Sequence, residues 1–102
     1  MIQHIVLLDL PHGHDANELA AVMRGLANLV GVIDGFTGFT HGPNRDFERK
    51  SPGYAYGFNC IFTQASALKA YADNPQHQDL GARLVALCNG GADGIFVADI
   101  ET

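Results

Sequence analysis

Three segments of this chain carry apolar side chains at neighbouring positions: residues 2–10, 54–62 and 94–100. A strand whose sheet is wet on one face alternates apolar with polar residues, and these segments mostly do not. Successive side chains of a strand point to opposite faces, so both faces of a sheet built from these segments are largely apolar. Such a sheet has to be covered on both sides, which excludes a fold with one broad hydrated sheet face.

Two further segments have helical periodicity. Residues 15–30 open with an Asp three residues before a Glu, the spacing of a capping box, and apolar residues then recur every three or four positions. A second helical region is expected from a cap at Thr63 to about Cys88, interrupted at Asn74-Pro75, where proline starts a new turn. The glycines that follow Asn89 predict its end.

A remaining strand is predicted over residues 35–41, and the polar segment 42–53 after it reads as an exposed loop. The order of elements is then βαββαβ, which is typical of an α+β, ferredoxin-like fold. We expect one domain over residues 1–102, with a four-stranded antiparallel sheet and two helices on one face. Two helices leave the other apolar face bare, and a second copy of the chain would cover it. The sequence therefore predicts a homodimer.

Charge and composition exclude several classes of partner. The net charge is −5, and the six Lys and Arg residues are scattered apart from Arg49-Lys50, so we expect no nucleic acid to bind. No apolar run approaches the roughly 20 residues of a membrane span, and no basic leader precedes the first strand. We expect a cytoplasmic protein that does not contact a membrane. Cys60 and Cys88 are expected to be buried free thiols.

Three residues are candidates for a site. His4 is the odd member of an apolar strand face, either a core histidine bonded to a neighbour or a polar group in a pocket. His77, neutral near pH 7, could take a proton from a carbon acid or a hydroxyl. Tyr71 could donate to the oxygen on which charge develops. The alternative for the last two is a helix-capping histidine beside a packed tyrosine.

A metal or a bound cofactor is not expected. His12 and His14 lie in one turn, with His41 as a candidate third ligand, but a metal needs three or four ligands and a solvated turn explains the pair as well. The glycines at 31–42 do not form the G-x-G-x-x-G fingerprint of dinucleotide binding.

Several motifs together resemble those of the stress-responsive A/B barrel family. They are His4-Ile5-Val6-Leu7-Leu8, Ile33-Asp34-Gly35-Phe36, Gly42-Pro43-Asn44, Gly53-Tyr54 and, most specifically, the run from Tyr71 through Pro75 to His77. The similarity spans nearly the whole chain in the family's order. It implies a dimeric α+β barrel.

The resemblance also implies candidate chemistry. A polyketide cyclase of this family performs aldol-type, lyase-class chemistry without metal or organic cofactor. Its base and its assisting tyrosine correspond to His77 and Tyr71, and the histidine of the first strand to His4. The chain departs from the family pattern at Asp9, at Asp34 and in its His12-Gly13-His14 turn.

Three functions therefore compete. The first is a cofactor-free enzyme that transfers protons on a small, largely apolar, oxygenated ligand. The second is a non-catalytic stress-related or ligand-binding oligomer. The third, a haem-degrading or quinone-type monooxygenase, is disfavoured because the chain has no Trp.

Overall fold

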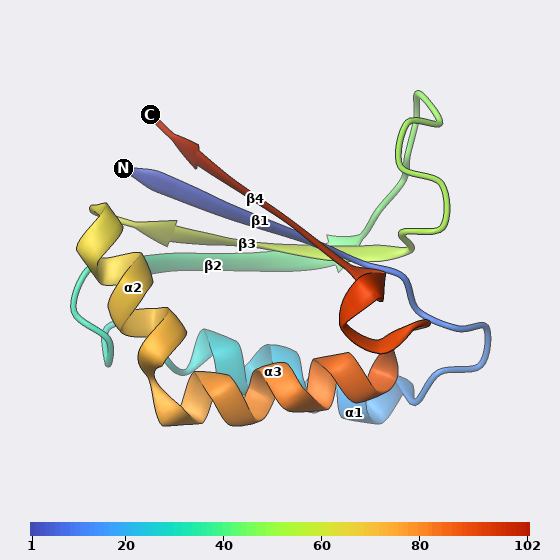
Figure 1. Cartoon of the computed structure of the whole chain (residues 1–102), viewed down its shortest axis with the longest axis horizontal. Helices are drawn as coiled ribbons and strands as arrows, with labels where there is room; N and C mark the ends of the chain where they lie inside the picture. The colour runs from blue at the N-terminus through green and yellow to red at the C-terminus, as the bar shows by residue number, and fades with distance from the viewer.

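The structure, a computed structural model, describes residues 1–102 and contains four strands, three α-helices and one short 3-10 helix (Figure 1). In chain order these are β1 (Ile2–Leu8), α1 (Ala16–Ala27), β2 (Phe36–Pro43), β3 (Tyr56–Phe62), α2 (Ala65–Asp73), α3 (Pro75–Leu87), η1 (Gly91–Gly94) and β4 (Ile95–Glu101).

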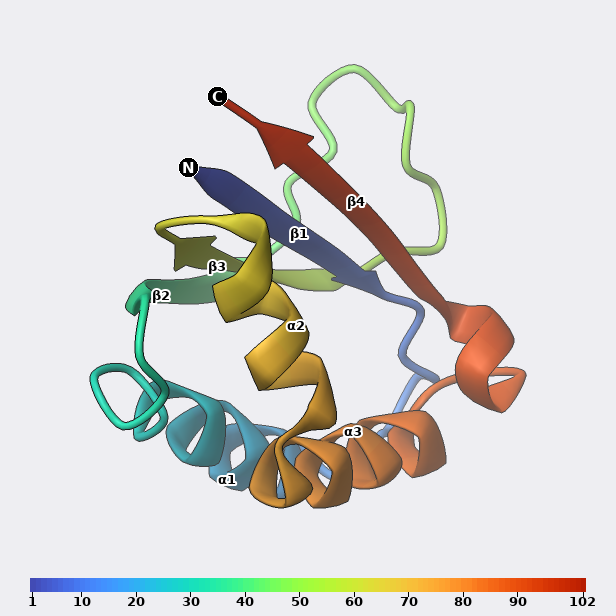
Figure 2. The same cartoon turned by 60° about the vertical axis from the view of Figure 1, so that its left-hand side comes forward.

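The strands form one antiparallel sheet in the order β2-β3-β1-β4. The helices lie on one side of this sheet, with α1 and α3 side by side beneath it and α2 crossing near one end (Figures 1 and 2). The predicted ferredoxin-like fold is confirmed. The second helical region forms two helices, α2 and α3, because Asn74 is extended and Pro75 starts a new helix in another direction.

Side chains define the helix starts. The Asp15 carboxylate accepts a hydrogen bond from the Glu18 amide at 3.0 Å, as the capping-box spacing predicts. The Asn74 side chain accepts one from the His77 amide at 3.1 Å and so caps α3. The cap predicted at Thr63 is wrong. The Thr63 amide donates to the Gly35 carbonyl at 2.9 Å, so Thr63 is held next to the start of β2. α2 begins one residue later, after Gln64.

Strand and helix ends differ from the sequence prediction by two or three residues. β1 ends at Leu8 rather than at residue 10, and α1 at Ala27 rather than at residue 30. β3 begins at Tyr56, so Tyr54 does not share its alternation; the Tyr54 ring lies against Phe96, on the opposite face of the sheet, at a centroid distance of 6.1 Å.

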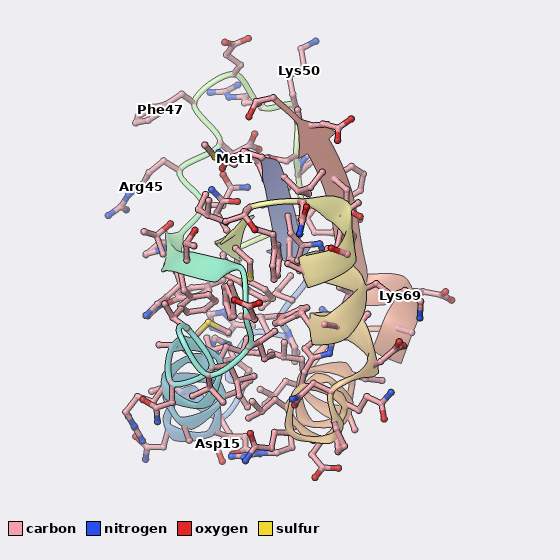
Figure 3. The ribbon with its side chains drawn as sticks, turned by 90° about the vertical axis from the view of Figure 1, so that its left-hand side faces the viewer. Met1, Asp15, Arg45, Phe47, Lys50 and Lys69 are labelled. Atoms are coloured by element: carbon pink, nitrogen blue, oxygen red, sulfur yellow. The ribbon has the colours of Figure 1, made fainter.

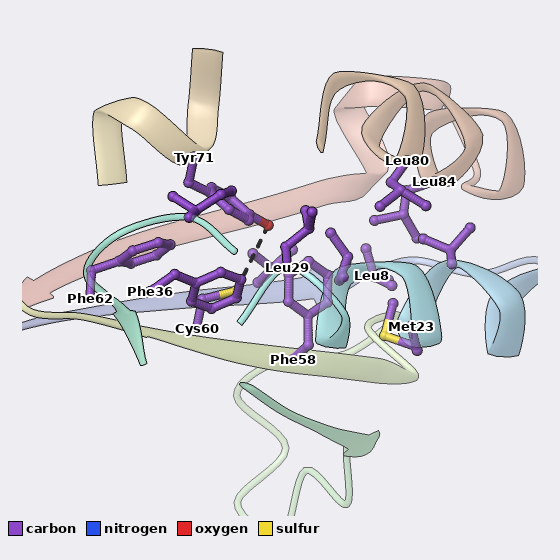
Figure 4. Packing of buried hydrophobic residues seen from close by; sticks show 14 of the residues in the cluster. Leu8, Met23, Leu29, Phe36, Phe58, Cys60, Phe62, Tyr71, Leu80 and Leu84 are labelled. Atoms are coloured by element: carbon purple, nitrogen blue, oxygen red, sulfur yellow. Dashed lines mark hydrogen bonds between the residues drawn. The ribbon is translucent and has the colours of Figure 1, made fainter. Parts of the chain in front are cut away.

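The core lies between the sheet and the helices (Figure 4). Alternate residues of β1 and β3 face the helices, and most of them are buried; Leu8 and Cys60 are 0% exposed. An aromatic cluster occupies one end, where Phe36 and Phe62 stack at a centroid distance of 4.8 Å beneath Tyr71. A bidentate ion pair between Glu18 and Arg83, with N–O distances of 2.6 and 2.9 Å, joins α1 to α3.

No helix covers the opposite face of the sheet, as the element order predicted (Figure 1). It carries Ile5, Leu7, Ile61, Phe96 and Ile100, and the last two are 48% and 50% exposed. We call it the bare face. Among the helices, none has both the length and the apolar character that a membrane crossing requires.

Candidate functional site

His4, Tyr71 and His77 line one cavity of about 220 Å³ between the sheet and the helices. β1 supplies the first of them, α2 the second and the first turn of α3 the third. The rest of the lining is apolar apart from a glycine, and consists of Val6, Leu26, Phe58, Gly81, Leu84, Ile95 and Val97. A few polar groups among apolar walls are the usual make-up of a small-molecule site, and this volume, below the roughly 300–1,000 Å³ of most ligand pockets, restricts the ligand to a small molecule.

The rings of the three residues are close together. Those of Tyr71 and His77 have centroids 3.8 Å apart and are tilted by 36°, and the His4 ring meets the Tyr71 ring edge-on at 5.8 Å. His4 and Tyr71 are 67 positions apart in the chain, and they flank one space because both side chains line the cavity between the sheet and the helices. The site residues that the sequence predicted are brought together.

A carboxylate holds His4. The His4 Nδ1 atom lies 2.5 Å from Asp99 Oδ1, and Asp99 is directly opposite His4 in the β1–β4 register. A carboxylate only accepts hydrogen bonds, so the His4 ring must carry a proton on Nδ1. In the neutral ring Nε2 then bears the free lone pair. The His4 side chain is 13% exposed and that of Asp99 is 45% exposed, which places the carboxylate nearer the solvent.

Tyr71 is buried with its hydroxyl near a thiol. The Cys60 Sγ atom donates a long hydrogen bond of 3.8 Å to the Tyr71 hydroxyl (Figure 4). Burial raises the pKa of the Tyr71 phenol well above its ordinary value. Burial also raises the pKa of the Cys60 thiol to about 12, which makes this sulfur a poor nucleophile. Tyr71 is therefore a neutral phenol that can donate a hydrogen bond.

His77 is the third residue after the cap of α3. Its Nδ1 atom is buried and has no hydrogen-bond partner. Burial lowers the pKa of His77; the nearby carbonyls of Ala72 and Tyr71 oppose that shift, and charge on His4 adds to it. The positive end of the helix dipole likewise disfavours a cation in the first turn. His77 is thus kept as the neutral imidazole that a general base requires, and the residue that caps the helix is Asn74.

The lowered pKa of His77 predicts how stability depends on pH. Above the ordinary histidine pKa both folded and unfolded states are neutral, and below it the unfolded state binds the proton first. Stability should therefore fall as the pH drops from about 6.5 toward the lower folded pKa. Urea unfolding at pH 7.5 and at pH 5 should show a larger loss for the natural chain than for His77→Gln. The exposed His12→Gln is the control and should keep the natural pH dependence.

The other histidines lie apart from this site. The His14 ring contacts the Pro11 carbonyl at 3.2 Å, and His41 Nδ1 lies 2.6 Å from the Tyr56 hydroxyl. No three His, Cys, Asp or Glu side chains come together as a metal site would require.

Asp99 and Gly81 are site residues that sequence reasoning missed. The signal for Asp99 was its place on the same strand face as Ile95 and Val97, but its pairing with His4 depends on the β1–β4 register. Gly81 lines the cavity, and a Cβ atom added to it would meet nothing within 4 Å.

The sequence model of one family, the stress responsive A/B barrel domain, matches residues 2–102. This chain belongs to that family, as the motifs predicted. A curated member, the stress-response A/B barrel domain-containing protein HS1 of Arabidopsis thaliana, is 24% identical over 100 residues, which are 98% of this chain and 88% of HS1.

Solved structures of other proteins share this fold. A dimeric ferredoxin-like protein of unknown function from Jannaschia sp. CCS1 is 46% identical, superposes with a TM-score of 0.92, and the match covers 99% of this chain and 98% of that one. A hydroxynitrile lyase from Passiflora edulis has a TM-score of 0.78 at 12% identity, covering 97% of this chain and 90% of the lyase. At that identity the likeness to the lyase shows the fold alone.

Proposed function

We propose that the cavity is the active site of a cofactor-free, lyase- or cyclase-type enzyme that moves protons on a small, largely apolar, oxygenated molecule. The observation that carries the proposal is the joint presence of His4, Tyr71 and His77 in one otherwise apolar cavity of about 220 Å³. The lining brings two imidazoles and a phenol together among apolar side chains, and the buried His77 Nδ1 atom makes no hydrogen bond of good geometry.

Each of the three polar residues has its own role in the proposed proton transfer. Neutral His77 removes a proton from the carbon next to a carbonyl, and the electrons of that C–H bond become those of an enolate. Tyr71 donates its hydroxyl proton as a hydrogen bond to the enolate oxygen, which lowers the energy of the charge that forms there. His4, with its tautomer set by Asp99, accepts a hydrogen bond from a substrate hydroxyl through Nε2. His77 later returns the proton to the enolate carbon. Alternatively, the enolate electrons form a C=C bond as a C–O bond on the neighbouring carbon breaks, and His77 protonates the oxygen that leaves.

The comparison with the Passiflora edulis lyase adds general support. Its fold matches the present one, so this architecture houses a lyase in at least one protein. At 12% identity it assigns no residue and no substrate. The residue roles rest on the cavity and on the tautomer and charge of its groups.

Proton exchange on small carbon acids tests the site. Aliphatic and aromatic methyl ketones in heavy water would be followed by proton NMR for exchange beside the carbonyl. General-base catalysis contributes about 100-fold or more, so His77→Gln should lose at least about 100-fold of the enzyme-dependent rate. His12→Gln, at an exposed turn, should keep the full rate. An unchanged rate in His77→Gln would remove that residue from the mechanism.

A cavity-filling variant tests whether the open cavity itself is needed, independently of its polar side chains. Gly81→Leu adds a side chain at a residue that lines the cavity, without changing His4, Tyr71 or His77. A Cβ atom there meets nothing within 4 Å, and leucine has a high helix propensity. We expect it to fold and to lose both ligand binding and exchange. If no ketone exchanges faster than in buffer and none shifts the histidine ring resonances, the non-catalytic, stress-related function is the better one.

The same chain is proposed to work as a homodimer through the bare face. The Jannaschia relative is described as dimeric, and the exposed Phe96 and Ile100 provide apolar surface for a partner sheet. Phe96→Asp should convert the dimer into a folded monomer, as seen by sedimentation velocity with circular dichroism. Val32→Asp introduces the same charge at an exposed apolar residue near the helices and should leave the dimer intact. A dimer that survives Phe96→Asp would place the interface elsewhere.

A further inference from the structure

The loop between β2 and β3, residues 44–55, projects from the sheet on the side opposite the helices (Figures 1 and 2). We call it the arm. Its base is closed by a hydrogen bond from the Asn44 amide to the Ala55 carbonyl at 2.9 Å. Tyr54, at the end of the arm, lies against Phe96 of the bare face. The arm therefore borders the space that a second sheet would occupy.

The arm has a built internal structure. The Asp46 carboxylate accepts hydrogen bonds from the Lys50 amide, the Ser51 amide and the Ser51 hydroxyl, each at 2.9 Å. The Asn44 side chain donates to Ser51 Oγ and to the Tyr54 carbonyl. Asp46 and Arg49 also hold positive φ angles of 46° and 57°, which cost energy in residues other than glycine. A loop with these constraints presents its outer side chains in a fixed arrangement.

Those outer side chains are an aromatic ring and cations. Phe47 is 91% exposed, more than any other large apolar residue of the chain. Arg45, Arg49 and Lys50 flank it in the sequence and make up three of the six Lys and Arg residues, and Figure 3 shows Arg45, Phe47 and Lys50 projecting outward. The arm holds these three cations and two acidic residues, so its net charge is positive. The net charge of the remaining residues is therefore more negative than the −5 of the whole chain.

We infer that the arm of each subunit clasps the second copy of the chain, with Phe47 buried against that copy and the surrounding cations facing its acidic surface. The inference rests on the homodimer proposed above. A partner sheet on the bare face lies beside the arm, and an acidic subunit complements a cationic arm. An aromatic ring at the centre of a charged rim is the usual composition of an interface hot spot. An anionic membrane is disfavoured as the occupant because it would repel the acidic remainder of the chain.

Dimer dissociation measures the contribution of the arm. Sedimentation velocity over a dilution series should give a dissociation constant at least about tenfold weaker for Phe47→Ser than for the natural chain, because two rings leave the interface. Val32→Ser removes an apolar side chain that is 68% exposed on the helix side and should leave the constant unchanged. A natural chain that is monomeric would contradict the homodimer itself. A natural dimer that Phe47→Ser leaves equally tight would contradict the arm alone.

Photocrosslinking tests the contact directly. The photoreactive residue p-benzoylphenylalanine at position 47 should give covalent dimers on irradiation, and the same residue at position 32 should give none. Mixed light and heavy isotope-labelled chains identify links between copies. Absence of dimer links from position 47, in a chain that sediments as a dimer, overturns the proposal. So does Phe47-dependent binding to vesicles of equal parts phosphatidylcholine and phosphatidylserine with dimer affinity unchanged.

Discussion

Tyr71→Ala is expected to lower the free energy of unfolding by about 3–5 kcal/mol, the cost of removing a buried aromatic ring. Tyr71 is 1% exposed, and its ring contacts those of Phe36, Phe62 and His77 at centroid distances of 5.3, 5.1 and 3.8 Å. Removing it would open a cavity among rings that cannot all move inward. Urea unfolding followed by circular dichroism measures the change.

Tyr71→Phe is the matched control and separates the ring from its hydroxyl. The hydroxyl has one long contact, from the Cys60 thiol at 3.8 Å, so its loss should cost less than about 1 kcal/mol. If the proposed function is correct, the same variant should exchange ketone protons more slowly while remaining folded. A large loss of stability in Tyr71→Phe would show that the hydroxyl serves the core.

Gly94→Ala should be nearly as damaging, at about 3 kcal/mol, because the backbone leaves no room for a methyl group. A Cβ atom on Gly94 would lie 2.2 Å from the Asn89 carbonyl oxygen. That segment has no freedom to retreat, since the Asn89 amide donates to the Asp9 carbonyl and the Asp9 amide donates to the Gly94 carbonyl, both at 2.8 Å. Thermal and urea unfolding would show the loss.

Gly81→Ala supplies the opposite result for the same chemical change. Its Cβ meets nothing within 4 Å and the residue is inside α3, so alanine should stabilise the chain by about 0.5–1 kcal/mol through helix propensity. Equal effects at positions 81 and 94 would mean that backbone entropy, not the close approach to Asn89, governs Gly94.

The sequence alone predicted the order of elements and the buried sides of the strands. Both are local properties: alternation assigns Val6 and Leu8 to one face, and the Asp15–Glu18 spacing starts α1. It failed at Thr63, where the residue is a good cap by type but a hydrogen bond to Gly35 decides where the helix begins. The acceptor of that hydrogen bond is 28 positions away in the chain, so no local sequence pattern could have predicted it.

The candidate site divides in the same way. Tyr71 and His77 were predicted as site residues mainly through the resemblance of the Tyr71–His77 run to the family motif, and His4 also as the odd member of an apolar strand face; their proximity follows from the fold. Asp99 as the partner of His4 and the open space at Gly81 were decided by tertiary structure alone. Strand register and cavity volume depend on how side chains from distant segments pack, and a linear sequence specifies these only through the complete fold.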